Sequence, residues 1–550
     1  MLLRFCYILP LLTIYLCIPL TTFATDWPHW TGPEGTNKSE ETGLVDTFDR
    51  KMMNNVKWVT RLGEVAFGCP TVSEGRVFVG TNMAALRFDK RFRNKRGGVI
   101  TCLDATTGEV RWNLACPDRS WGLPTGTFLE EQRCGVCSSP TVDGDRVYVV
   151  TNGDDVLCLD VAGLLNGNDG LFQEEGQFMA GEGEDPVSLL DTDGDILWRY
   201  DMPRELDVAP HDVASSSVLI HGDVLYVATS NGISRSREDN AKNAVNPEAP
   251  ALIALDKHTG KLLAHDDTDI SKTLFHAQWG SPSLAKVGEQ ELVLLGGADG
   301  ICYAFKAWRG GEDVLEVAWQ FDCNPHHYKE RSDGTPIEYS FGDHRAYKHK
   351  KKLNEDIAAF NNEQADAKRK AIDYKASLND YNASDGTFIG PSEILATPIC
   401  YKDKVYVATG RDPLHGLGRG VLTCIDATGT GDISETGLVW RFEDIGRSLS
   451  TVAIADGLVY ASDLGGRLYC LDAETGKLYW THDTKNEIWG HPLVADGKVY
   501  LNAHDSFWIL KAGRDKNLLF HSRGGGGSGA IAANGVVYAY IRSQLYAFSK

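Results

Sequence analysis

Short runs of β-branched and aromatic residues dominate the hydrophobic pattern of the chain, and each follows a turn that carries Gly or Asp. A second run then ends in an apolar–Asp or apolar–Phe step, as in VITCLD and LYAF, so each unit predicts a hairpin. The last three units begin about 40 and 38 residues apart, which is the span of one four-stranded propeller blade. The eight first runs are GRVFVGT (75–81), GDRVYVVT (144–151), GDVLYVAT (222–229), ELVLLGG (291–297), DKVYVAT (403–409), GLVYASD (457–463), GKVYLNA (497–503) and GVVYAYI (535–541).

The eight units predict an all-β fold, an eight-bladed β-propeller of four-stranded antiparallel blades that fills residues 25–550 as a single domain. After Phe548 the chain has no room for a fourth strand in the last unit. The segment VKWVTRLG (56–63), with Trp58, has the pattern of an outer strand. We therefore expect this N-terminal strand to complete the last blade, because such closure removes exposed sheet edges.

A longer signature occurs twice, as LDATTGEVRW (103–112) and LDAETGKLYW (471–480). Its Asp and Thr side chains can bond the amides of a turn, its Gly supplies a positive φ, and its Trp is expected to pack between neighbouring blades. Other units keep part of this signature. LDKHTGKLLA (255–264) retains the turn, and Trp198, Trp319 and Trp440 close units after insertions.

These D-x-x-T-G-x-x-x-W turns resemble the tryptophan-docking motifs of the quinoprotein propeller superfamily, whose repeats are of the pyrroloquinoline-quinone-like (PQQ-like) type. The resemblance covers nearly the whole chain after residue 24. Within that superfamily, WPHWTGPEGTNKSEETGL (27–44) and IGRSLSTVAIADGLVY (445–460) resemble secreted quinone-repeat proteins abundant in planctomycete-type bacteria. Because the superfamily includes dehydrogenases and assembly scaffolds, the resemblance implies a fold more specifically than a function.

For the dehydrogenases of the superfamily, the resemblance implies PQQ held with calcium by Glu, Asn and Asp, an Asp base, and a disulfide between adjacent cysteines. No two cysteines of this chain are neighbours, and the calcium-binding positions cannot be matched motif by motif. Cys134 and Cys137 are two residues apart, and we favour a structural role for them over a redox or metal pair. Five cysteines share one expected core position in successive units: Cys102, Cys158, Cys302, Cys424 and Cys470.

Residues 1–24 have the pattern of a secretory signal, with Arg4, an apolar run and a small-residue exit at Ala24. We expect cleavage and export to the periplasm or the exterior, with no membrane span left in the mature chain. A retained anchor is the alternative, although Pro10 and Pro19 interrupt the run. The formal charge of −20 leaves no large basic face, which excludes nucleic acid as an expected partner.

An acidic loop interrupts unit two at residues 161–195 and contains NGNDG (166–170) and DTDGD (191–195). Asp191, Asp193 and Asp195 place carboxylates at alternate positions, as in a calcium-binding loop. Turn formation is the favoured interpretation, because Asp and Gly are also turn residues and the terminal Glu of a complete loop is missing.

A second insertion spans residues 324–392 and contains a charged, Ala-rich stretch. Across 346–382, apolar residues recur at spacings of four and three, which predicts a helix of roughly 35 residues, or ~50 Å. A helix or helical hairpin on the propeller rim is the favoured interpretation. The alternative is a docking element for a partner or a second copy.

Polar residues at the start of successive units are expected to line a central funnel, because the inner strands of a propeller converge there. Together these side chains suit an anionic planar ligand held between aromatic faces, although each alone is more simply a polar cap of a strand. The candidate cofactor-binding residues are Arg133, His211, Asp212, His276, Gln278, Trp279, Glu393, Arg447, Trp489, His491 and Arg523.

We favour a secreted, non-catalytic scaffold that binds a ligand or protein at the funnel face or at the 346–382 helix. The alternative is a periplasmic alcohol or sugar dehydrogenase that uses PQQ and calcium, cofactors that only the resemblance implies. A hydrolase or lyase that uses His211, His276 or His491 as acid or base has least support.

Overall fold

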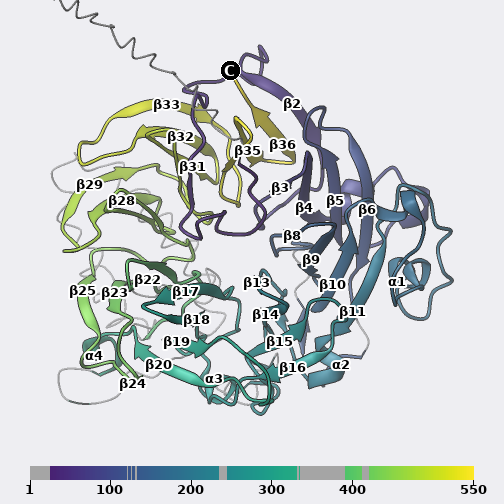
Figure 1. The fold of residues 1–550 in the computed structure, drawn as a ribbon. Helices are drawn as coiled ribbons and strands as arrows, with labels where there is room; N and C mark the ends of the chain where they lie inside the picture. Colours follow the sequence, from purple (N-terminus) through teal and green to yellow (C-terminus); the bar gives the residue numbers. More distant parts are fainter. Residues whose placement is uncertain are drawn as a thin grey trace, which may run out of the picture.

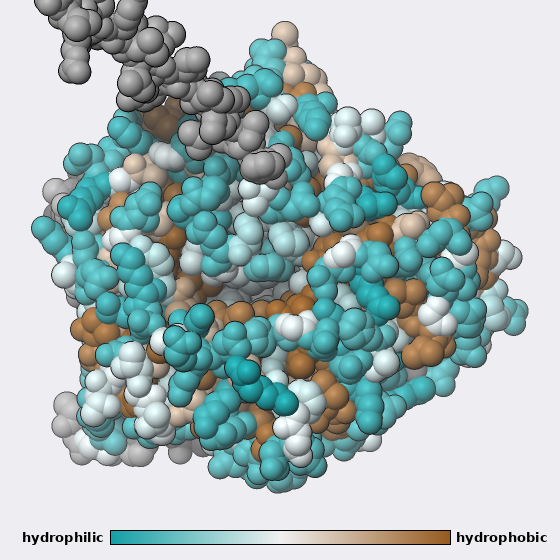
Figure 2. All heavy atoms as spheres, viewed as in Figure 1, coloured by the Kyte–Doolittle hydropathy of each residue, from teal (hydrophilic) through white to brown (hydrophobic). Residues whose placement is uncertain are grey.

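The computed structural model describes residues 25–119, 122–125, 127–129, 133–234, 244–330, 334, 391–411 and 420–550. Within these residues, antiparallel sheets of four strands follow one another in a ring (Figure 1). After the outer strand of one blade, the chain returns to the axis and begins the inner strand of the next blade. They form the eight blades that the repeats predict. The face of the ring seen in Figure 2 is mostly hydrophilic.

Blades 1 to 4 run in chain order from the inner to the outer strand. Their strands are β3 (Thr71–Ser73), β4 (Arg76–Asn82), β5 (Gly97–Asp104) and β6 (Val110–Pro117); β8 (Thr141–Asp143), β9 (Arg146–Val150), β10 (Asp155–Asp160) and β11 (Ile196–Asp201); β13 (Leu219–His221), β14 (Val224–Ala228), β15 (Leu252–Asp256) and β16 (Leu262–His265); and β17 (Ser283–Val287), β18 (Gln290–Gly296), β19 (Ile301–Lys306) and β20 (Val317–Asp322).

Blades 5 to 8 continue the ring. Their strands are β21 (Ile399–Tyr401), β22 (Lys404–Ala408), β23 (Leu422–Asp426) and β25 (Leu438–Phe442); β26 (Ala453–Ala455), β27 (Leu458–Ser462), β28 (Arg467–Asp472) and β29 (Leu478–Asp483); β30 (Leu493–Ala495), β31 (Lys498–Ala503), β32 (Ser506–Lys511) and β33 (Leu518–Arg523); and β34 (Ile531–Ala533), β35 (Val536–Ile541), β36 (Gln544–Phe548) and β2 (Val56–Arg61).

Short strands and helices lie outside the four-stranded blades. Two short strands extend blades 7 and 4 in parallel, and another two pair with each other beside the funnel. They are β1 (Lys38–Ser39), β24 (Gly431–Asp432), β7 (Phe128–Leu129) and β12 (His211–Asp212). The helices among the described residues are η1 (Met83–Leu86), η2 (Lys90–Phe92), η3 (Gly163–Asn166), α1 (Glu175–Ala180), α2 (Met202–Leu206), α3 (Ile270–Thr273) and α4 (His326–Lys329).

The last blade is closed by the N-terminal strand, as the sequence predicts. Strand β2 pairs antiparallel with β36, with Trp58 opposite Ala547. Phe48, just before β2, stacks on Phe548 near the C-terminus with ring centroids 4.0 Å apart. A strand near the N-terminus and the last strand of the chain are therefore paired in one blade, which closes the ring.

Tryptophans of five outer strands connect their blades to the next blade through an indole hydrogen bond. Trp112 of β6 is buried and donates a 3.0 Å hydrogen bond to the carbonyl of Val161 in blade 2. Trp198 of β11 donates to Lys257 in blade 3, and a Cβ on Gly260 would lie 2.5 Å from its ring. This packing confirms the wedge between blades that the signature predicts, and it requires a glycine at the turn.

The N-terminal segment 25–45 crosses the central axis of the ring. Its Pro28 carbonyl accepts a hydrogen bond from Val142 of blade 2, whereas its Thr36 carbonyl accepts one from Ile454 of blade 6. Strand β1 then pairs with β30 of blade 7. Because the inner strands of blades 2 and 6 face each other across the ring, a segment bonded to both must span the space between them.

Two segments predicted from the sequence lie outside the residues that the structure describes. The signal segment 1–24 and the helix across 346–382 lie outside the described residues, as does most of the 324–392 insertion. Of that insertion, α4 is the only helix in the described part. Among the described residues, none of the helices has the length and apolar character needed to cross a membrane.

Candidate functional site

The predicted funnel residues lie on connections that lead from an outer strand to the inner strand of the next blade. Asp212 lies between β11 and β13, and His276 lies between β16 and β17. Trp489 and His491 precede β30 in the same way. The repeat therefore brings these connections to one face of the ring, where side chains of consecutive blades can meet.

Three of the predicted residues converge in a buried cluster. His211, Asp212 and His276 have exposed fractions of 4%, 6% and 0%. The Nε2 atom of His211 lies 3.9 Å from Oδ1 of Asp212, and Nε2 of His276 lies 3.7 Å from Oδ2 of the same carboxylate. The two imidazole rings are 4.6 Å apart, edge to face. The cluster joins blade 3 to blade 4.

Trp279 and Gln278 support this cluster. The indole of Trp279 donates a 3.1 Å hydrogen bond to the carbonyl of His211, and its ring lies edge-on to His276 at 4.9 Å. The amide of Gln278 donates to Gly296 and accepts from the backbone N–H of Ala298. Both polar ends of Gln278 are thus used within blade 4, so this side chain positions backbone and is not available to a ligand.

His491 lies in a different environment. Its Nε2 is 3.2 Å from Sγ of Cys69, and its ring packs edge-on against Trp30 of the N-terminal segment at 5.3 Å. Burial lowers the pKa of His491 to about 4. The neighbouring Trp489 donates its indole N–H to Glu487. This histidine therefore packs between the axis segment and the blades.

The remaining candidates do not join the His211 cluster. Arg133 and Arg523 are exposed. Glu393 and Arg447 are buried, and their backbone carbonyls accept hydrogen bonds from Gly410 and Leu464. Of the eleven residues proposed from sequence, the structure brings together His211, Asp212, His276 and Trp279.

The described candidates do not fit a quinone cofactor. Gln278 bonds backbone groups through both polar ends, and His491 is enclosed by protein groups. The axis itself is filled by the N-terminal segment. Among the described residues, none of the eleven cysteines forms a disulfide, and the pair Cys134 and Cys137 is among them. A planar ligand on the axis would have to displace this packing.

The structure does not bring the three candidate calcium ligands of the acidic loop together as one group. Asp193 is buried and receives two hydrogen bonds from Arg91, at 2.6 and 2.8 Å, so its charge is already paired. Asp191 is exposed. Asp195 is buried and instead lies with Asp160 and Asp169, with one oxygen from each carboxylate within 4.8 Å of the others. The three side chains do not meet, because Asp193 points toward Arg91 of η2.

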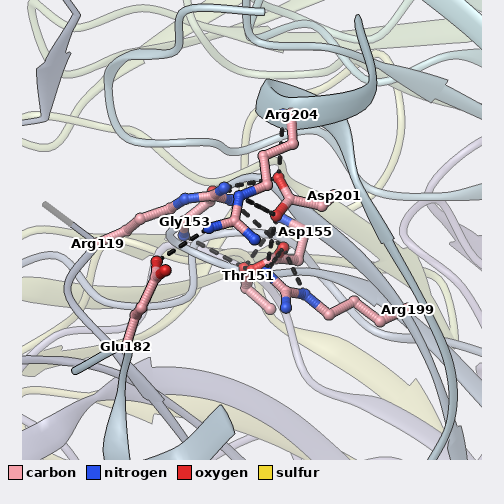
Figure 3. Close-up of polar contacts among 8 residues, drawn as sticks. All are labelled: Arg119, Thr151, Gly153, Asp155, Glu182, Arg199, Asp201 and Arg204. Carbon is pink, nitrogen blue, oxygen red and sulfur yellow. Dashed lines mark hydrogen bonds and ion pairs between the residues drawn. The ribbon is translucent and has the colours of Figure 1, made fainter. Parts of the chain in front are cut away.

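A network of ion pairs, which the sequence did not predict, lies beneath the acidic loop of blade 2 (Figure 3). Arg119 donates to both oxygens of Asp201 at 2.7 and 2.8 Å and also contacts Asp155 at 3.4 Å. Arg199 contacts the same two carboxylates at 2.8 and 3.0 Å. Because Arg119 follows the outer strand of blade 1, the network ties that connection to β10 and β11.

The network forms the floor of a cleft of 590 Å³. Helix α1 and the loop after it form one wall, and Arg204 of α2 reaches across to Glu182 at 2.9 Å. Six carboxylates and three guanidinium groups line it, an acidic excess that Lys95 and Arg96 partly offset through ion pairs with Glu184 and Asp118. The carboxylates are Asp118, Asp155, Glu174, Glu182, Glu184 and Asp185. The sequence revealed the acidic stretch but gave no signal for the arginines beneath it.

Fold and motifs together define a PQQ-like propeller protein. A family model described as outer membrane protein assembly factor BamB matches residues 55–235 and 418–539, more than half of the chain. The chain belongs to this family.

The solved structures that resemble the chain share little sequence with it. BamB from Moraxella catarrhalis has 13% identity and a TM-score of 0.47, with 90% of this chain and 97% of that chain covered. Quinohemoprotein alcohol dehydrogenase from Comamonas testosteroni has 11% identity and a TM-score of 0.42, with 96% and 81% covered. A europium-containing methanol dehydrogenase has 10% identity and a TM-score of 0.43, with 94% and 89% covered. No curated protein matches the sequence significantly.

Proposed function

We propose that the protein is an exported, non-catalytic scaffold that binds a cationic segment of a partner protein in the acidic cleft of blade 2. The observation that carries this proposal is the excess of carboxylates around a cleft whose floor is already fixed by ion pairs. A preformed site loses little conformational entropy on binding, and excess negative charge attracts lysine and arginine side chains.

The placement of the cleft supports a role in binding. Its wall is part of the 161–195 insertion, which the repeat itself does not require. The funnel face is a weaker candidate for the partner because the axis is filled and Gln278 and His491 are used in packing. The 346–382 segment remains a predicted alternative docking element.

The family supports the scaffold over an enzyme. Its description names an outer membrane assembly factor, and export through residues 1–24 would bring this chain to the periplasm or the exterior. A cation-binding cleft would then hold one component of an assembly while the rigid ring presents other surfaces.

The proposal can be tested with a fluorescent peptide of alternating Lys and Gly, measured by anisotropy with the purified mature chain. Replacing Glu182, Glu184 and Asp185 with Lys should weaken binding by about tenfold or more, since three favourable charge contacts become repulsive. The matched control replaces three exposed acidic residues of blade 4, Glu312, Asp313 and Glu316, with Lys. Equal losses in both variants would show non-specific attraction to an acidic protein and would refute the cleft.

The dehydrogenase alternative is tested separately. Purified protein is incubated with PQQ and Ca²⁺, and thermal shift and dye-linked oxidation of an alcohol panel are recorded. We expect no saturable shift and no dye reduction. A saturable shift with dye reduction would replace the scaffold by a quinone-dependent dehydrogenase.

A further inference from the structure

We infer that His211, Asp212 and His276 form a binding site for a divalent first-row transition metal ion, for which Zn²⁺ serves as the probe. The ligand atoms of these three side chains lie within 4.8 Å of one another, and all three residues are buried. The site lies on the funnel face between blades 3 and 4. It is separate from the acidic cleft of blade 2 and does not depend on the scaffold function.

The distances within the cluster suit ligands that share an ion. The separations of 3.7 and 3.9 Å between the imidazole nitrogens and the Asp212 oxygens exceed the length of a hydrogen bond. Ligands bound tetrahedrally at about 2.0–2.1 Å from Zn²⁺ lie roughly 3.3–3.5 Å from one another. Small side-chain rotations would therefore bring the three atoms to coordinating distance.

The tautomer of His211 is fixed for metal binding. Its Nδ1 lies 2.7 Å from the carbonyl oxygen of Ile233. Since a carbonyl oxygen can only accept, Nδ1 carries a proton in this contact, which leaves Nε2 as the nitrogen that coordinates a metal ion when the ring is neutral. A backbone carbonyl bonded to the far nitrogen is the usual outer contact of a metal-binding histidine.

The same stretch of backbone holds both histidines. The N–H of Ile233 donates to the carbonyl of His276 at 3.0 Å, while its carbonyl accepts from His211. The preceding residue must be small, because a Cβ on Gly232 would lie 2.5 Å from Cβ of His211. Asp212 itself has a left-handed backbone with φ of +62°. These constraints position all three ligands before any ion binds.

The donor set selects the kind of metal. Two imidazoles and one carboxylate suit Zn²⁺, Fe²⁺, Ni²⁺ or Cu²⁺, whereas Ca²⁺ and Mg²⁺ prefer oxygen ligands throughout. Three protein ligands leave at least one coordination position for water or a small ligand. The site therefore differs in both ligands and metal from a calcium site beside a quinone.

The test uses the full mature chain with an affinity tag that contains no histidine. The chain is stripped with a chelator and titrated with Zn²⁺ by calorimetry and with Co²⁺ by visible absorption, which reports the coordination geometry. We expect about one ion per chain. His211→Gln, Asp212→Asn and His276→Gln should each weaken Zn²⁺ binding by about tenfold or more.

His221→Gln is the matched control. His221 belongs to β13 of the same blade, contacts Glu291 at 3.2 Å and is not part of the cluster, so binding should remain within about twofold of the wild-type affinity. Thermal unfolding of the wild-type chain is also measured with and without Zn²⁺, so that this readout does not depend on any variant folding correctly. The unfolding temperature should rise when Zn²⁺ is present. A folded wild-type chain that binds no Zn²⁺ or Co²⁺, or variants that bind as tightly as the wild type, would overturn the assignment.

Discussion

The indole N–H of Trp58 donates a 3.0 Å hydrogen bond to the carbonyl oxygen of Ala105, and this bond ties the last blade to the first. Trp440 makes the equivalent bond to Ala473, and Trp480 makes it to Gly513. The tryptophan of one blade and the turn of the next therefore form a single contact that is repeated at five of the eight boundaries between blades. Each half of the repeated signature belongs to a different interface between blades.

The first prediction concerns the glycine under Trp58. Gly108 has φ of +75°, and a Cβ there would lie 2.6 Å from the indole ring. Gly108→Ala should therefore lower the free energy of unfolding by about 2–4 kcal/mol, from the left-handed backbone and the steric clash together. The urea-unfolding midpoint measures this loss.

Gly144 provides the control for this substitution. It has φ of +58°, and a Cβ there would meet no atom within 4 Å. Gly144→Ala should cost only the backbone contribution of about 1–2 kcal/mol. Equal losses at the two positions would mean that the tryptophan contact is not tightly packed.

The second prediction concerns the buried ion pairs of blade 2. The side chain of Arg119 is 3% exposed, so Arg119→Ala leaves Asp155 and Asp201 with less compensation in a buried setting. We expect a loss of about 2–4 kcal/mol in the free energy of unfolding, moderated by Arg199. Arg204 is 46% exposed, and Arg204→Ala should cost less than about 1 kcal/mol. If the two variants unfold at the same urea concentration, the network does not stabilise the blade.

The ring could be predicted from the sequence, because blade structure is local and repeated. The turn residues and the tryptophans recur at fixed positions in the repeat, which identifies their roles. The strand at 56–63 has the pattern of the outer strand that the last unit lacks. The course of segment 27–44 across the axis could not be predicted. That segment has no counterpart in the repeat, and its partners are backbone groups of distant blades.

The sites were only partly predictable for the same reason. His211 and His276 occupy equivalent connections, so the repeat suggested that they could meet. The register of the repeat also grouped His491 with them, although its neighbours are Cys69 and Trp30. Arg119 and Arg199 lie outside the repeated motif, and their pairing depends on how blade 1 leads into blade 2.

The third prediction follows from the lowered pKa of His491. Burial brings this pKa from 6.5 to about 4, so between these values the unfolded chain binds a proton that the folded chain does not. Stability should therefore fall as the pH drops from 6.5 to 4, by at most about 1.4 kcal/mol per pH unit from this residue. The contribution of His491 should level off below pH 4.

His491→Gln should make this dependence shallower, because the side chain no longer titrates. Thermal midpoints of both proteins across this pH range provide the comparison. His29 and His482 also have pKa values lowered to about 4 by burial, so some dependence should remain. Parallel curves for the two proteins would show that His491 titrates normally in the folded chain.

The fourth prediction concerns the segment that fills the axis. Asn37 is fully buried, has φ of +55° and donates from its side chain to the carbonyl of Val452 in blade 6, while its own carbonyl accepts from Val494 in blade 7. Asn37→Ala should cost about 2–4 kcal/mol, since it removes a buried hydrogen bond and places alanine in a left-handed backbone.

Two further variants separate these contributions. Asn37→Gly relieves the backbone and should recover about 1–2 kcal/mol of the loss, leaving the cost of the missing hydrogen bond. Lys38→Ala removes a partly exposed contact with Glu40 and should cost less than about 1 kcal/mol. Urea unfolding, with limited proteolysis to detect release of the N-terminal segment, provides the measurement. If Asn37→Ala unfolds like Lys38→Ala, the segment covers the axis without bracing the blades.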